Sequence, residues 1–198
     1  DVEHREVIVE ELLKRYLSAN HFEKAHRLRF DFKVVDSKLI AAFKAVGFSQ
    51  KTQTYLTYEL ELESKAAPFQ NESKECDAAE VARTLSNLHS VSDDQAVQWI
   101  REGSIRTLEV DHEVVAAAHL SFHVPNAEIV RIATKAEYLR LGFAKRLLIA
   151  LSDELGANGF KKMFLKVEST NEAAIACYQS FGFVVNESKT QTWLSIYF

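Results

Sequence analysis

The stretch that decides the fold spans residues 138–145 and reads Tyr138-Leu139-Arg140-Leu141-Gly142-Phe143-Ala144-Lys145. A strand pattern precedes it over Glu128–Thr134, and a helical pattern follows it over Gly142–Asn158. A helix start leaves four backbone N–H groups unpaired at the positive end of the helix dipole, which suits a pyrophosphate. Gly142 and Ala144 leave the approach open, and basic side chains add positive charge: Arg140, Lys145 and Arg146. Taken alone, this loop favours an ordinary capped helix whose basic first turn faces solvent.

The segments around this unit predict an α/β fold with a mixed, mainly antiparallel sheet flanked by helices. Upstream of the unit we expect helices over Ala78–His89 and Asp93–Glu102, then a hairpin of Arg106–Val110 with Val114–His123. Downstream we expect a strand, a helix and two closing strands: Lys162–Glu168, Asn171–Ser180, Phe183–Val185 and Thr190–Tyr197. Near the N-terminus the expected elements are a helix, a strand, a helix and a long strand: Glu6–Ala19, Leu28–Val35, Ser37–Val46 and Thr52–Leu62.

The chain also repeats itself, because Lys51-Thr52-Gln53-Thr54 is identical to Lys189-Thr190-Gln191-Thr192. Three further matches precede this one in the same order: 19–24 with 157–162, 28–34 with 163–169, and 45–48 with 180–183. Ordered matches at a nearly constant offset predict a duplication. We therefore expect 1–65 to be a non-catalytic half-copy of the C-terminal half of the fold, 66–76 a junction, and 77–198 the catalytic domain. We expect the half-copy to pack against or beside the sheet of the second copy.

Three landmarks follow the loop in order: the strand residues Lys166-Val167, then Asn171, then a short helix that carries Tyr178 and ends in Gly182-Phe183. With Gly142-Phe143-Ala144 they resemble the core of the GNAT superfamily of N-acetyltransferases over residues 127–183. The family pattern is Arg/Gln-x-x-Gly-x-Gly/Ala, then Asn, then Tyr-x-x-x-Gly-Phe. The family's Arg or Gln falls at Leu139 here, with Arg140 beside it.

This resemblance implies that acetyl-CoA is the acyl donor and that the acceptor is an amine. The backbone of Ile132 and Thr134 would pair with the pantetheine arm, and Asn171 would contact the cofactor further along. The pyrophosphate would lie on the loop and the helix start, at Leu139, Arg140, Leu141, Gly142, Phe143, Ala144 and Lys145. Thioester and amine would meet between the strands at 128–134 and 163–168, so that catalysis would rest largely on positioning.

The resemblance places Tyr178 where the family commonly has a proton donor for the leaving thiolate. Its alternative role is that of a packed aromatic. At the matching positions the first copy has Phe43 for Tyr178 and Asp36 for Asn171, so we expect that copy to lack activity. Glu128 is our candidate base, and its alternative is an exposed carboxylate at a strand edge. Other residues weighed are two histidines, a loop glutamate and a thiol that we expect to be structural: His119, His123, Glu137 and Cys177.

Composition excludes several classes of protein. The net charge of -4 gives no basic surface for nucleic acid, and no apolar run is long enough to cross a membrane. Two cysteines among scattered histidines show no metal-ligand spacing, so we expect no metal and a cytoplasmic protein with free thiols. The first residue is Asp1, so we expect a processed chain or part of a longer protein. A non-catalytic acyl-CoA-binding or regulatory module is the alternative function, and neither the acceptor nor the oligomeric state is indicated.

Overall fold

The computed structural model describes residues 49–63, 76–86 and 90–197, together with the single positions 11, 41, 44 and 45. Apart from those single positions, the elements expected over 6–19, 28–35 and 37–46 lie outside the described residues. Most of the expected junction at 66–76 also lies outside them. The chain divides into two compact units, and the larger one comprises Thr57–Val167 and Asn171–Glu187.

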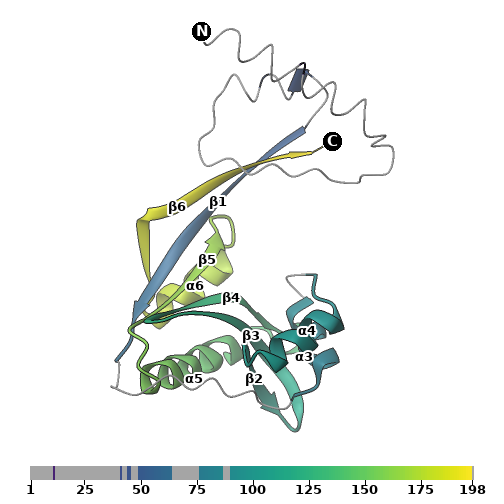
Figure 1. Cartoon of the computed structure of the whole chain (residues 1–198), viewed down its shortest axis with the longest axis vertical. Coiled ribbons are helices and arrows are strands. Elements are labelled where there is room, and N and C mark those ends of the chain that lie inside the picture. The colour runs from purple at the N-terminus through teal and green to yellow at the C-terminus, as the bar shows by residue number, and fades with distance from the viewer. Residues whose placement is uncertain are drawn as a thin grey trace. The chain divides into compact units, whose positions relative to one another are not determined.

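Six strands form a mixed sheet in the order β2-β3-β4-β5-β1-β6 (Figure 1). Their bounds are β1 Ser49–Glu61, β2 Ile105–Val110, β3 Glu113–His123, β4 Asn126–Thr134, β5 Lys162–Glu168 and β6 Val184–Tyr197. β2, β3 and β4 pair antiparallel, whereas β4 and β5 pair parallel. The α/β class with a mixed, mainly antiparallel sheet is therefore confirmed.

The helices of the larger unit are α3 Ala78–Ser86, α4 Asp93–Arg101, α5 Phe143–Ala157 and α6 Glu172–Phe181, with a 3-10 turn, η2, over Ala136–Tyr138. Local chemistry sets their ends. Ser92 and Gln95 form a capping box at the start of α4, and Gly182 ends α6 with φ 111°. No helix in the described part of the chain is long and apolar enough to cross a membrane.

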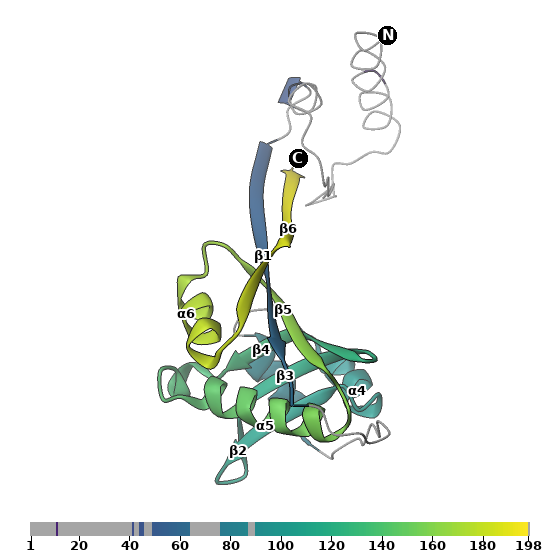
Figure 2. The ribbon, with the colours of Figure 1, turned by 90° about the vertical axis from the view of Figure 1, so that its left-hand side faces the viewer.

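The two faces of β2–β4 are covered by different helices (Figure 2). Val81 and Leu85 of α3 and Ala96 of α4 pack with Ala117 and Ala133 on one face. α5 packs against β2, β3 and β4 on the other face. Since β3 is covered on both sides, Val114–Ala118 is a continuous buried run rather than an alternating one.

Two features of the sheet differ from expectation. β1, from the segment predicted as the half-copy, lies between β5 and β6 within the sheet itself. The expected separate strands at 183–185 and 190–197 are wrong, because β6 is one strand over Val184–Tyr197. The polar residues 186–189 indicated a turn, but β1 lies alongside as a hydrogen-bonding neighbour, and this tertiary contact overrides the local signal.

The smaller unit comprises Asp1–Leu56, Glu168–Thr170 and Ser188–Phe198. Within it the hydroxyls of Thr54 and Thr192 lie 3.2 Å apart, and the Ser169 N–H donates to the Thr54 carbonyl at 2.7 Å. The first contact joins two equivalent positions of the sequence repeat, the last residue of each Lys-Thr-Gln-Thr.

One glycine of α5 lies close to the backbone that follows β1. A Cβ at Gly156 would lie 2.6 Å from the backbone oxygen of Glu63. Alanine would gain about 1 kcal/mol in helix propensity, but overpacking against backbone costs about 1–3 kcal/mol. We therefore expect Gly156→Ala to lower the free energy of unfolding by up to about 2 kcal/mol in urea denaturation. The neighbouring exposed change Ala157→Ser is the control, and a Gly156→Ala protein more stable than the parent would contradict this packing.

Candidate functional site

The parallel strands β4 and β5 pair over only part of their length. The pairing joins Asn126–Ile129 to Lys162–Leu165, and in the described structure it extends no further toward Thr134. On its other side β4 is irregular, since the register with β3 skips Val130. Beyond Ile129, β4 therefore presents backbone groups on its β5 side that an extended ligand could pair with. Ile132 and Thr134, our candidates for contacts with pantetheine, lie in this part of β4.

The loop after β4 exposes backbone N–H groups at the start of α5. Gly142 is the N-cap residue with φ 82°, and no side chain caps the helix. The first of the residues 142–146 to donate a backbone hydrogen bond is Arg146, which donates to the Gly142 carbonyl. A Cβ at Gly142 would meet nothing within 4 Å. The flanking Leu139 and Leu141 side chains are 57% and 64% exposed, so the described surroundings leave these amides open to a ligand.

An ion-pair network holds the segment just before this loop. Glu113 at the start of β3 accepts from the Lys135 ammonium at 2.7 Å and from the Tyr138 hydroxyl at 2.9 Å. These two hydrogen bonds lower the pKa of the Glu113 carboxyl. Tyr138 also packs edge-on against Phe143, at a centroid distance of 5.5 Å. The network therefore fixes η2, and through Phe143 it supports the first turn of α5.

If this network orders the loop, Glu113→Gln should weaken binding of a ligand at the start of α5. The amide keeps one acceptor oxygen but loses the charge that holds Lys135. We expect the KM for the loop's ligand to rise about three- to tenfold with little change in kcat, because the loss affects ground-state binding. Glu109→Gln, an exposed change on β2, is the matched control, and an equal effect of both variants would contradict the anchoring role.

Tyr178 lies on α6 and is largely enclosed. Burial raises the pKa of its phenol to about 12, and its ring packs edge-on against Phe183 at 5.9 Å. None of the residues that the structure describes accepts a hydrogen bond from its hydroxyl. The phenol stays protonated at neutral pH and has a proton to donate.

Asn171 plays a structural part that the sequence did not predict. It is the N-cap of α6, and its side-chain oxygen accepts from the Ala174 N–H at 3.1 Å. That oxygen is occupied, which leaves the side-chain NH₂ for any contact with a cofactor.

The base candidates lie on neighbouring strands. Glu128 on β4 contacts Lys166 on β5 at 3.0 Å and His123 on β3 at 3.7 Å. His119 is arranged differently: burial and the Arg131 charge lower its pKa to about 4, and its Nδ1 accepts from Arg131 at 3.4 Å. With that nitrogen occupied, His119 is poorly placed to take a proton.

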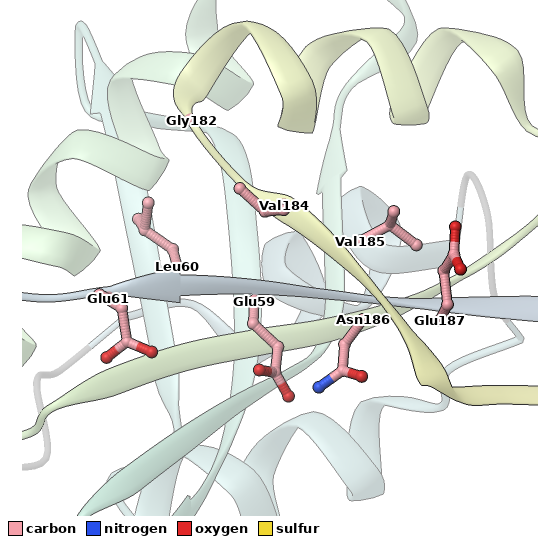
Figure 3. Close-up of a pocket in the computed structure, with 8 residues that line it drawn as sticks. All are labelled: Glu59, Leu60, Glu61, Gly182, Val184, Val185, Asn186 and Glu187. Carbon is pink, nitrogen blue, oxygen red and sulfur yellow. The ribbon is translucent and has the colours of Figure 1, made fainter.

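A separate hollow of about 480 Å³ lies between β1 and β6 (Figure 3). It is lined by Glu59, Leu60, Glu61, Gly182, Val184, Val185, Asn186 and Glu187. Its glutamates would repel phosphate, and two of them already pair with Lys162, at 2.9 and 3.1 Å. None of the residues predicted for the cofactor lines it. No group of three or more metal-binding side chains occurs among the described residues.

Three features now define the candidate site: the diverging strands β4 and β5, the open start of α5 and the enclosed Tyr178. A match to a protein family covers all three. The model of the Acetyltransferase (GNAT) family matches residues 59–183, which is more than half of the 198 residues. The chain belongs to the GNAT family. The match begins at Glu59, near the end of β1, and ends at Phe183.

Curated GNAT relatives match part of the chain. A [ribosomal protein bS18]-alanine N-acetyltransferase of Salmonella typhimurium is 36% identical over 76 residues, which are 38% of this chain and 51% of that enzyme. A mycothiol acetyltransferase of Corynebacterium glutamicum is 28% identical over 101 residues, which are 50% of this chain and 35% of that enzyme. The chain thus spans 51% of the length of the first relative and 35% of the length of the second.

Solved structures show the same fold. A GCN5-related N-acetyltransferase from Sphaerobacter thermophilus superposes with a TM-score of 0.64 at 12% identity, covering 90% of this chain and 62% of that one. The ribosomal-protein-S18-alanine N-acetyltransferase of Escherichia coli gives 0.52 at 21% identity, covering 71% and 91%. At these identities the likeness concerns the GNAT fold alone.

Sequence reasoning missed three contributors to the candidate site. Lys166 could have been found, because it lies near Glu128 once β4 and β5 are placed in parallel register. The Glu113 anchor of Tyr138 and the packing of Arg131 against Trp99 depend on tertiary contacts between distant segments, and no local pattern indicates them.

Proposed function

We propose that this GNAT chain is an N-acetyltransferase that moves an acetyl group from acetyl-CoA to an amine by direct attack. The observation that carries the proposal is the uncapped start of α5, which follows directly on the part of β4 that β5 leaves unpaired. Helix N-termini bind pyrophosphate through backbone N–H groups. An open strand edge leading into such a site suits an amide-containing arm such as pantetheine. Leu141, Gly142, Phe143, Ala144 and Lys145 would supply the N–H groups, with Leu139 and Arg140 beside them.

The proposed chemistry uses two groups of this chain. The amine nitrogen attacks the thioester carbonyl carbon, a C–N bond forms and the C–S bond breaks. Tyr178 gives its proton to the leaving sulfur, and its raised pKa keeps that proton available. Glu128 takes the proton lost by the amine. Its partners, Lys166 and His123, hold the carboxylate in place from the neighbouring strands.

The name of one relative supports an amine acceptor, because it describes N-acetylation of an alanine of ribosomal protein bS18. The name of the other describes acetylation connected with mycothiol. One feature favours the second candidate, a non-catalytic acyl-CoA-binding module: Leu139 stands where the family pattern has Arg or Gln. Tyr178 favours the enzyme, because it is protonated and has no hydrogen-bond acceptor among the described residues, and binding alone needs no acid at that place.

Calorimetric titration with acetyl-CoA tests the site through two matched variants at Gly142. Both Asn and Asp tolerate the left-handed backbone, and only Asp adds a charge beside the proposed pyrophosphate. We expect one acetyl-CoA per parent chain, a similar Kd for Gly142→Asn, and a Kd at least about tenfold higher for Gly142→Asp. Absence of binding to the parent protein at millimolar acetyl-CoA would remove both candidate functions.

We also propose that residues 1–65 are a partial duplicate of the fold, with residues 77–198 carrying the activity. The contact between the hydroxyls of Thr54 and Thr192 supports this, because equivalent residues of two copies meet where a local two-fold axis passes between the copies. The separation of these residues, 138, equals the offset of the two Lys-Thr-Gln-Thr sequences. In this interpretation β1 is the last strand of the first copy and contributes to the sheet of the second.

A further inference from the structure

Trp99, His119 and Arg131 form a stacked cluster that the proposed chemistry does not use. The ring centroids of Trp99 and His119 lie 4.0 Å apart with an interplanar angle of 15°. The Arg131 Cζ lies 5.0 Å from the centroid of the Trp99 ring. The three side chains come from α4, β3 and β4, and His119 and Arg131 are register partners. Stacking on Trp99 therefore fixes the orientation of the guanidinium.

The charge of this cluster is not balanced. Arg131 donates from Nη1 to His119 Nδ1, while its Nε is buried and has no hydrogen-bond partner in the part of the chain that the structure describes. No carboxylate of the described residues forms an ion pair with Arg131. The charge of Glu102 raises the pKa of His119, but this effect is smaller than the lowering by Arg131. Because His119 is neutral at pH 7, the cluster carries the charge of one partly buried guanidinium, which an anion would stabilise.

Arg131 also lies close to the place of the proposed reaction. Ile129 is the last residue of β4 that pairs with β5, and Val130 is the irregular position that follows it. Arg131 comes directly after Val130. Its register partner His119 shares a face of the sheet with Ser121 and His123, and Glu128 lies opposite Ser121. Arg131 and the candidate base Glu128 are thus on the same face, one on each side of the point where β4 and β5 separate.

We propose that Arg131 binds a carboxylate on the amine acceptor, so that the preferred acceptors are amino carboxylates. This inference rests on the proposed acetyl transfer and names the substrate class for it. Stacking on an indole leaves the in-plane N–H groups of a guanidinium unblocked. For Arg131 the Nη2 group and the second Nη1 hydrogen remain for a ligand, and a planar carboxylate matches the fork between them. The carboxylate takes no part in bond making. It positions the amine, and it neutralises the charge that the described residues leave unpaired.

The test compares acceptors that differ only in the carboxylate. Glycine, β-alanine, 4-aminobutyrate and 5-aminovalerate are each assayed beside the corresponding amide, with release of the coenzyme A thiol as the readout. We expect kcat/KM for the best carboxylate to exceed that of its amide by about 10- to 100-fold. In Arg131→Gln this ratio should fall to about one while the rate with the amide stays the same. In Arg131→Lys, which keeps the charge but loses the fork, the ratio should be intermediate.

Arg101→Gln is the matched control, because it removes one exposed positive charge two residues from Trp99 on the same helix. It should leave the ratio unchanged. Equal rates with carboxylates and amides in the parent protein, or a preference that survives in Arg131→Gln, would overturn the inference and leave the acetyl transfer standing. Turnover of no amine at all, with acetyl-CoA still bound, would instead overturn the proposed function.

A second readout does not depend on activity or on the stability of a variant. The ¹⁵Nε–¹H resonance of Arg131 can be followed in the parent protein while N-acetylglycine, or its amide, is added in the presence of coenzyme A. We expect a saturable shift with the carboxylate and none with the amide. The same response to both, or to neither, would contradict binding of the carboxylate by this side chain.

Discussion

Replacing Tyr178 with phenylalanine is expected to lower kcat about 100-fold or more while the Kd for acetyl-CoA stays within about twofold of the parent value. The variant removes one oxygen and leaves the ring packed against Phe183. Burial raises the pKa of the hydroxyl to about 12, so at neutral pH it is an acid that still holds its proton. Loss of that acid affects the departure of the thiolate and leaves cofactor binding intact.

Tyr58→Phe is the control for this experiment. Tyr58 is also buried, and its hydroxyl accepts a hydrogen bond from Gln179 of the same helix, α6, at 3.2 Å. Its removal should cost about 1 kcal/mol of stability and leave kcat unchanged. If Tyr178→Phe turned over at the parent rate, Tyr178 would be a packing residue and the proton would come from elsewhere.

Removal of residues 1–65 is expected to abolish folding of the remainder. β1 lies between β5 and β6, so a chain that begins at residue 66 lacks a strand from within its sheet. Two of the lost side chains, Thr57 and Tyr58, are each only 2% exposed. The deletion also removes the hydrogen bond from the Leu62 N–H to the Lys161 carbonyl and the carboxylates that pair with Lys162. The exposed edges of β5 and β6 would then promote aggregation.

Sedimentation and thermal unfolding of the shortened chain measure this effect. Co-expression of residues 49–63 as a separate peptide provides the matched rescue, because it returns β1 alone. We expect insoluble protein without the peptide, and a soluble complex that unfolds cooperatively with it. A chain 66–198 that is soluble and as stable as the parent would show that β1 is dispensable.

Local signals in the sequence predicted most elements of the larger unit. Lys162–Glu168 was placed without error, and Gly182 was recognised as the end of α6 because capping chemistry is encoded within a few residues. The position of β1 within the sheet could not be predicted, since strand order depends on contacts between segments far apart in the chain. The same reason explains the error at β6. The sequence analysis divided this strand at its polar residues, but β6 stays continuous there beside its neighbour β1.

In the candidate site, too, features with a local signal could be predicted from the sequence, and features that depend on tertiary contacts could not. The loop and Tyr178 could be proposed from spacing, because their residues occur in a recognisable order along the chain. The role of Asn171 as the N-cap of α6 was missed, although an Asn before a helical run is a local capping signal. Arg131 carried no signal, since its significance comes from stacking on Trp99 and from the absence of a carboxylate partner among the described residues.

Amide hydrogen exchange with and without acetyl-CoA tests the location of the donor site most directly. Backbone amides at 141–145 donate no hydrogen bond within the described structure and should exchange rapidly in the free protein. If the pyrophosphate lies on the start of α5, acetyl-CoA should slow exchange at 141–145 and at 130–134, and leave 78–86 of α3 unchanged. Binding that protects the hollow between β1 and β6 and leaves 141–145 as fast as before would contradict the account.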